Sequence, residues 1–170
     1  PACTRGHPHL CGNTFSHDEN EAFEAASTIK SYILLDLFRQ VEEGKKDLEE
    51  LLPYKESYRV EGSGVLHNME SGFSMQVKNY ATLMIIVSDN TATNAMIDYL
   101  GLEEINKTIE DYGFSGTKLH NPIDWDEYKD LGTTTAKDYG EFFYKLHQGE
   151  LVSPEASKAM IDIFKKQHYN

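Results

Sequence analysis

The chain has 170 residues, and its 16 Lys and Arg against 28 Asp and Glu leave a formal net charge of −12. This length suits one domain with a real hydrophobic core. The acidic balance argues against nucleic acid or an anionic membrane as a partner, because both need clustered cations. No membrane span is expected, since the longest apolar run, at 83–87, is far shorter than the roughly 18 residues that cross a bilayer.

The first residues differ in character from the rest of the chain. Cys3 and Cys11 are the only cysteines, with His7 and His9 between them. These residues could suggest a metal site, but their spacing fits no common zinc pattern. We therefore favour an unstructured leader, with one disulfide if the compartment is oxidising. No signal peptide is visible, because no basic region precedes an apolar one. We predict an irregular leader at 1–14 and a helical domain at 15–170, without a metal or other cofactor.

Helical spacing of apolar residues begins after Ser27, which is a good helix start, and Gly44 is a good stop. A short helix is expected at 47–52, and a loop or short extended segment at 58–66. Residues 77–87 are apolar on nearly every side, which predicts a fully buried helix.

The second half of the chain also indicates mostly helices. We expect them at 91–100 and 103–112, with Gly101 and Gly113 at their ends, and another after the three threonines at 133–135. A long loop is expected at 116–131. Ser153 and Pro154 predict the start of a last helix, because proline suits the first helical position. The predicted fold class is therefore mostly α, with few strand candidates.

Two polar motifs fall where helices should begin. Ser-Thr-Ile-Lys occupies 27–30, and Ser-Asp-Asn follows 61 residues later at 88–90. Ser-x-x-Lys alone is a weak signal, because a second match at 115–118 lies in a glycine-rich stretch without a helix behind it. The 27–30 match opens an amphipathic run, and Ser-Asp-Asn directly follows the most apolar helix. A polar cluster at the end of a buried helix is well placed for a functional site.

These residue types suit acyl transfer. A serine hydroxyl such as Ser27 needs a base to become a nucleophile, and Lys30 lies one helical turn away on the same face. Burial would lower the pKa of Lys30 and make its neutral amine a usable base. Ser88 can relay a proton to a leaving group. Asn90 can donate to a substrate carbonyl or hold Lys30, and Asp89 can cap the following helix. The simpler alternatives are a helix cap, a solvated lysine and an ordinary polar turn.

Together the motifs resemble those of class A β-lactamase-like and penicillin-binding serine hydrolases. Residues 23–30 are similar to the nucleophile segment, and 87–94 to the second motif with its following helix. The resemblance extends over about 15–167. It implies the helical lobe of a two-lobed fold, which in that family packs on a five-stranded antiparallel sheet. It also implies Ser27 as the acylated nucleophile with Lys30, Ser88 and Asn90 as partners, and an extracellular or cell-envelope location.

Three departures from the family pattern stand out. No Lys-Thr-Gly or Lys-Ser-Gly occurs, although the family carries this motif on a strand after the last helix expected here. The glutamate that activates the deacylating water in family β-lactamases falls on Ile123, with Asp124, Asp126 and Glu127 nearby but out of register. The first strand expected before Phe15 is replaced by the leader. We therefore predict a truncated form, a helical lobe with most of the antiparallel sheet missing.

Three functions remain open. The leading one is a serine hydrolase that is acylated by a β-lactam on Ser27 and is impaired by truncation. A second is a D-alanyl peptide carboxypeptidase or transpeptidase, because Ile123 removes the usual deacylating base. A third is a catalytically inactive helical module that acts by association. Helices without their sheet would expose an apolar face, so a homo-oligomer such as a dimer is expected.

Overall fold

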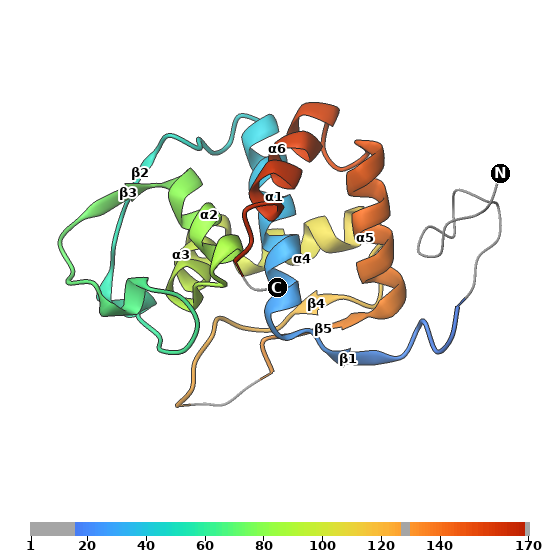
Figure 1. Cartoon of the computed structure of the whole chain (residues 1–170), viewed down its shortest axis with the longest axis horizontal. Coiled ribbons are helices and arrows are strands. Elements are labelled where there is room, and N and C mark those ends of the chain that lie inside the picture. The colour runs from blue at the N-terminus through green and yellow to red at the C-terminus, as the bar shows by residue number, and fades with distance from the viewer. Residues whose placement is uncertain (1–15, 127–129, 169–170) are drawn as a thin grey trace.

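The computed structural model describes residues 16–126 and 130–168. The leader predicted at 1–14, with its cysteines and histidines, lies outside the described residues. Six α-helices dominate what is described (Figure 1). They are α1 (Lys30–Glu42), α2 (Val77–Ile86), α3 (Asn90–Leu100), α4 (Leu102–Asp111), α5 (Ala136–Gln148) and α6 (Pro154–Phe164). None of the helices in these ranges is long and apolar enough to cross a membrane. The predicted mostly α fold class is confirmed.

The strands form two small antiparallel sheets. One has the order β1-β5-β4, and the other pairs β2 with β3. The strands are β1 (Ala22–Glu24), β2 (Leu51–Pro53), β3 (Ser74–Gln76), β4 (Lys118–Leu119) and β5 (Gly132–Thr135). Gly132 allows β4 and β5 to approach, because a Cβ there would lie 2.5 Å from the Lys118 carbonyl oxygen. The β1-β5 pair matters for function, since the residues that follow β1 lead directly into the candidate site.

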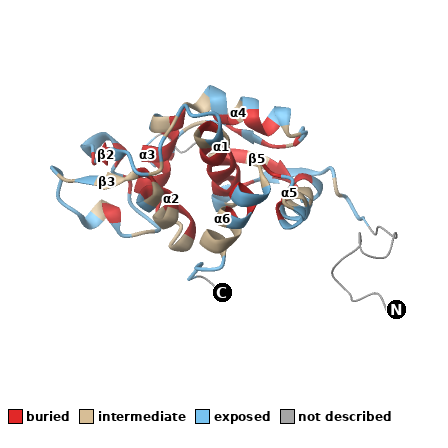
Figure 2. Cartoon of the chain, turned by 90° about the horizontal axis from the view of Figure 1, so that it is seen from above, coloured by how far each residue is buried: buried red, intermediate tan, exposed pale blue. Residues whose placement is uncertain are grey.

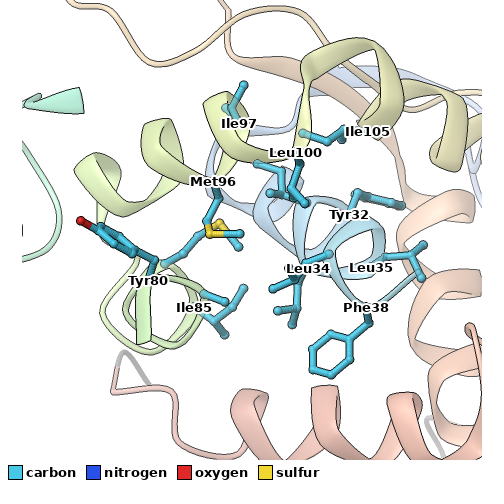
Figure 3. Close-up of a cluster of buried hydrophobic side chains, with 14 of the residues drawn as sticks. Tyr32, Leu34, Leu35, Phe38, Tyr80, Ile85, Met96, Ile97, Leu100 and Ile105 are labelled. Atoms are coloured by element: carbon cyan, nitrogen blue, oxygen red, sulfur yellow. The ribbon is translucent and has the colours of Figure 1, made fainter. Parts of the chain in front are cut away.

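Helix α1 lies at the centre of the molecule, packed against α2, α3, α4 and α6 (Figures 1 and 2). Its side chains form one hydrophobic cluster with those of its neighbours, including Tyr80 from α2, Met96 from α3 and Ile105 from α4 (Figure 3). Even its polar residues are enclosed. Asp36 is fully buried and accepts hydrogen bonds from Arg39, Gln40 and Thr108. Such pairing compensates for the loss of hydration. The central helix therefore holds the residues at its start in a rigid position.

The burial of α1 and α2 differs from what their sequences predict. The run at 77–87 was expected to be fully buried, yet Leu83 and Ile86 are only half-buried on α2. The helix with the clearer amphipathic pattern, α1, is buried on nearly all sides. Composition reports how apolar a helix is, but the number of neighbours that surround it depends on tertiary packing.

Two local predictions are wrong. Residues 47–52 form a turn and the start of β2, not a helix, because Leu52 pairs with Met75 of β3 and the Val77 N–H donates to the Glu50 carbonyl at 2.9 Å. The three threonines form most of β5, and the long loop expected at 116–131 contains β4. In each case the partner strand is distant in the sequence, and strands this short carry little local signal. The helices expected after position 77 are all present.

Candidate active site

Ser27 lies in a short 3-10 helix, η2 (Ala26–Ile29), between β1 and α1. The prediction that Ser27 begins the long helix is wrong by three residues, because α1 begins at Lys30 and the Ser27 side chain makes no capping bond. Ala26 has φ of 44°, a left-handed conformation that is unfavourable for a residue with a side chain. The turn leaves Ser27 exposed, so its hydroxyl is accessible to a ligand.

Lys30 is the first residue of α1, and only 2% of it is exposed. Its Nζ donates to three acceptors, the Ser88 carbonyl oxygen at 2.7 Å, Ser88 Oγ at 2.9 Å and Asn90 Oδ1 at 3.0 Å. Burial lowers the pKa of Lys30 to about 8, and the nearby negative charge of Asp89 opposes this shift. A substantial fraction of the amine is therefore neutral near physiological pH.

Ser88 links the lysine to Ser27. Its Oγ accepts from Lys30 Nζ and donates to Ser27 Oγ at 2.9 Å. Ser88 has φ of 51°, an unfavourable conformation like that of Ala26. The positions of both hydroxyl groups therefore depend on a strained backbone, at Ser88 itself and at the residue before Ser27. Strain of this kind clusters at functional sites, where surrounding structure enforces it. Ser27, Ser88 and Lys30 thus converge, as the two sequence motifs predict.

Asp89 is fully buried and organises the backbone around the site. Its carboxylate accepts from the Ala92 N–H at 2.8 Å, which caps α3, and from the N–H groups of Val65 at 2.6 Å and Leu66 at 2.9 Å. A Cβ on Gly64 would lie only 2.3 Å from this side chain. Asp89 therefore caps α3, as the sequence suggests, but this is only one of its roles. It also fixes the loop that follows Gly62.

Asn90 holds the same loop from the other side. Its backbone N–H donates to the Ser63 carbonyl at 3.0 Å, and its Nδ2 donates to the Glu61 carbonyl at 3.1 Å. Its Oδ1 accepts from Lys30. The four polar residues expected at the site therefore meet at the junction of α1 and α3. The second Ser-x-x-Lys match does not join them, since Ser115 and Lys118 line a separate surface groove.

A cavity of about 250 Å³ opens in front of Ser27. Its wall includes Ser27, Asn90, Ile123, Asp124 and Trp125. Ile123, at the position expected for the deacylating glutamate, is 8% exposed. Asp124 also lines the cavity, Asp126 lines a neighbouring one, and Glu127 lies outside the described residues.

A second cavity, of about 320 Å³, also reaches Ser27. Ser27, Lys30 and Ser88 form its polar part, and Phe143 and Phe164 belong to its apolar wall. Among the described residues, no group of three or more His, Cys, Asp or Glu side chains could hold a metal ion. Ser27 thus lines both cavities, whereas Lys30 and Ser88 line only the second.

Sequence reasoning did not single out two residues at this site. Asn94 holds Ile123 from α3, and Trp125 lines the cavity. Asn94 lies four residues after Asn90, one helical turn further on the same side, which is a signal that could have identified it. The only available signal for Trp125 is that it is the sole tryptophan of the chain.

With this geometry in view, comparison with known proteins identifies the family. The family described as Beta-lactamase enzyme family matches residues 11–170, nearly the whole chain. The chain belongs to this family. It is 31% identical over 104 residues to β-lactamase BRO-1 of Moraxella catarrhalis, a match that spans 60% of this chain and 33% of BRO-1.

Two solved structures are similar over most of the chain. A β-lactamase from Sphaerobacter thermophilus shares 30% identity with a TM-score of 0.86, covering 94% of this chain and 61% of that one. A mutant of PBP-A, solved as an acyl-enzyme complex with penicillin G, shares 33% identity with a TM-score of 0.86, covering 94% and 60%. The chain thus has the helical lobe of a β-lactamase-like fold and spans about three fifths of these neighbours.

Proposed function

We propose that this chain carries the site of a serine acyl-transfer enzyme in which Ser27 attacks the carbonyl carbon of a β-lactam. The observation that carries the proposal is the continuous link from Lys30 Nζ through Ser88 Oγ to Ser27 Oγ, at 2.9 Å for each step. Family membership and the fold support a β-lactamase-like hydrolase.

The proton path follows from this link. Once Lys30 is neutral, the two hydroxyl hydrogens must rotate so that Ser27 donates to Ser88 and Ser88 donates to Lys30 Nζ, the reverse of the bonds described above. The Lys30 amine then takes the Ser88 proton while Ser88 takes the proton of Ser27, and the Ser27 oxygen forms its bond to the carbonyl carbon. When the lactam C–N bond breaks, the same path returns a proton to the ring nitrogen. With a Lys30 pKa of about 8, about a tenth of the amine is neutral at pH 7, which suffices for a base that acts once in each acylation.

Deacylation is proposed to be slow. A β-lactamase needs a group that activates water against the acyl-enzyme, and the residue expected in that role is the hydrocarbon side chain of Ile123 on the cavity wall. A hydrocarbon can neither accept a proton nor orient water. The acyl group is therefore expected to stay on Ser27. A similar protein, the PBP-A mutant, was solved as such an adduct with penicillin G.

A second candidate keeps the nucleophile and changes the substrate. Ile123 also suits a D-alanyl peptide carboxypeptidase or transpeptidase, whose acyl group can pass to an amine without a carboxylate to activate water.

The 170 residues contain no Lys-Thr-Gly motif, which in the family supplies carboxylate recognition and part of the oxyanion hole. Loss of one oxyanion donor raises a barrier by about 2.7–4 kcal/mol in the best-studied case. These residues on their own are therefore expected to acylate slowly. If they do not acylate at all, the inactive helical module becomes the better description.

Intact mass spectrometry after incubation with penicillin G tests the proposal. We expect a gain of one intact penicillin, stable after free drug is removed, and absent in Ser27→Ala. Ser115→Ala is the matched control, because it removes the serine of the other Ser-x-x-Lys match and should retain the adduct. No adduct on the wild type contradicts the acyl-transfer proposal. Rapid hydrolysis that is lost in Ser27→Ala contradicts slow deacylation and would point to Asp124 or Asp126 as the base.

A further inference from the structure

The turn at Ser88 ends α2 abruptly. Ser88 has φ of 51°, so the chain leaves the helix there. In a continued helix the Ile85 carbonyl would accept from the Asp89 N–H, but that N–H donates to another carbonyl of α2. The Ile86 carbonyl would likewise accept from the Asn90 N–H, which instead donates to a neighbouring loop. Two carbonyl groups at the end of α2 therefore need donors from outside the helix.

The chain that follows α6 supplies both donors (Figure 1). Gln167 Nε2 donates to the Ile85 carbonyl oxygen at 2.9 Å, and the His168 N–H donates to that of Ile86 at 2.9 Å. The backbone of Gln167 is itself fixed, because its N–H donates to the Phe164 carbonyl at 3.1 Å. The end of α2 is thus held by a segment that is 82 positions away in the sequence.

Gln167 also lies beside the candidate site. It lines the 320 Å³ cavity together with Ser27, Lys30 and Ser88. Its side chain is exposed, so water could satisfy the amide without any bond to α2. The bond to Ile85 therefore matters for the carbonyl that it satisfies, which lies three residues before Ser88.

The end of α2 determines the direction of the Ser88 hydroxyl. Ser88 is the group through which Lys30 reaches Ser27, at 2.9 Å for each step. A shift of the turn by about 1 Å would lengthen both steps beyond hydrogen-bond distance, and a misplacement of this size can cost about 10²-fold in rate.

We propose that Gln167 is a positioning residue for acylation, because it holds the turn that directs the Ser88 hydroxyl. This rests on the proposed function, and it adds a residue whose role does not require contact with the substrate. The Gln167 amide acts on the Ile85 carbonyl, and through the end of α2 it acts on Ser88.

A double-mutant cycle separates this role from a merely structural one. Gln167→Met keeps the length of the side chain and loses the donor, so it should lower the second-order rate of Ser27 acylation by penicillin G about tenfold. In a Ser88→Ala background, which has no hydroxyl to direct, the same substitution should change the rate by less than about twofold. Gln148→Met, the same change at an exposed position of α5, is the matched control and should keep the wild-type rate. Equal losses in the two backgrounds, or no loss in the wild-type background, would overturn the proposal.

Hydrogen exchange tests the positioning without acylation, and it decides the question if Ser88→Ala forms no adduct. The Asp89 amide follows Ser88 and donates to the Leu83 carbonyl at 3.1 Å. In Gln167→Met it should exchange at least about tenfold faster, whereas the amide of Ile109, buried on α4, should change much less. Equal acceleration of both amides would mean a general loss of stability, and it would overturn the proposal, as would an unchanged rate at Asp89. Faster exchange at Asp89 alone, in a chain that is not acylated as wild type, would refute the proposed acyl transfer and leave the hold of Gln167 on the turn standing.

Discussion

Asn94 binds Ile123 through both backbone groups of that residue. Asn94 Nδ2 donates to the Ile123 carbonyl oxygen at 2.9 Å, and the Ile123 N–H donates to Asn94 Oδ1 at 2.8 Å. Asn90 and Asn94 are one turn apart on α3, so the same helix face organises Lys30 and the opposite wall of the cavity. The side chain at position 123 is therefore held against the cavity by buried hydrogen bonds and not by the loop alone.

Ile123→Glu should shorten the lifetime of the acyl-enzyme. A carboxylate on this fixed backbone would face the Ser27 cavity and could activate water, and general bases typically contribute about 10²–10⁴ in rate. We expect loss of the penicillin G adduct to accelerate by at least about tenfold, measured by intact mass after removal of free drug. Ile123→Gln is the matched control, because glutamine has nearly the same shape as glutamate but cannot act as a base. Equal adduct lifetimes in the two variants would show that position 123 does not reach the acyl group.

Asn94→Ala should destabilise the protein and loosen the 121–126 segment. Two buried backbone groups of Ile123 would lose their partners, and each buried unsatisfied group costs about 1–3 kcal/mol. We expect the free energy of unfolding, from urea denaturation, to fall by about 2 kcal/mol or more. Asn121→Ala is the control in the same segment, since the Asn121 side chain bonds only the neighbouring Pro122 carbonyl among its described contacts. If both variants unfold at the same urea concentration as the wild type, Asn94 does not hold the segment.

Acylation should accelerate with pH up to a midpoint near 8. Because burial lowers the pKa of Lys30 to about 8, the neutral amine increases about tenfold per unit below that value and levels off above it. The rate of adduct formation from pH 6 to 9.5 measures this. Lys30→Arg, which stays charged throughout, should lower the rate by about 10²–10⁴ and remove the midpoint. A wild-type rate that does not change over this range would exclude Lys30 as the base.

The helices and the polar cluster follow from the sequence because their signals are local. The motifs at 27–30 and 88–90 each sit at the junction between one helix and the next, and burial of α1 against α3 brings them together. The position of the exposed Ser27 was less predictable. Its 3-10 turn depends on the bond from the Ala25 N–H to the Gly132 carbonyl, which joins segments more than a hundred residues apart.

Contacts between loops could not be predicted from the sequence. Trp125 meets Glu61 only because Asn94 fixes the path of the later segment and Asp89 fixes that of the earlier one. No periodic pattern marks either loop, and the two lie 64 positions apart. Conversely, the family comparison supports the chemistry suggested by the motifs but does not determine which substrate reaches Ser27.

The apolar side of the second cavity should promote association. Phe143 on α5 is 37% exposed and lines this cavity together with Phe164. Exposed apolar surface of this kind tends to find a partner. We expect light scattering to detect a dimer or larger species at micromolar concentration, weakened at least about tenfold in Phe143→Glu. Gln148→Glu, at another exposed position of α5, changes the charge by the same amount and is the control. A monomer at all concentrations would contradict the expected homo-oligomer.

Ala26→Gly should stabilise the fold and impair acylation. Ala26 has φ of 44°, where a Cβ is strained by about 1–2 kcal/mol and glycine is not. Part of this gain is offset by the greater freedom of glycine in the unfolded chain, so the net rise in the free energy of unfolding should be about 0.5–1 kcal/mol. The neighbouring Ala25, buried and with φ of −69°, is the matched control, because glycine there gains nothing and should destabilise. The turn carries Ser27, so removing its rigidity should lower the acylation rate severalfold while stability rises. A variant that is less stable than the wild type would show that the conformation at Ala26 is not strained.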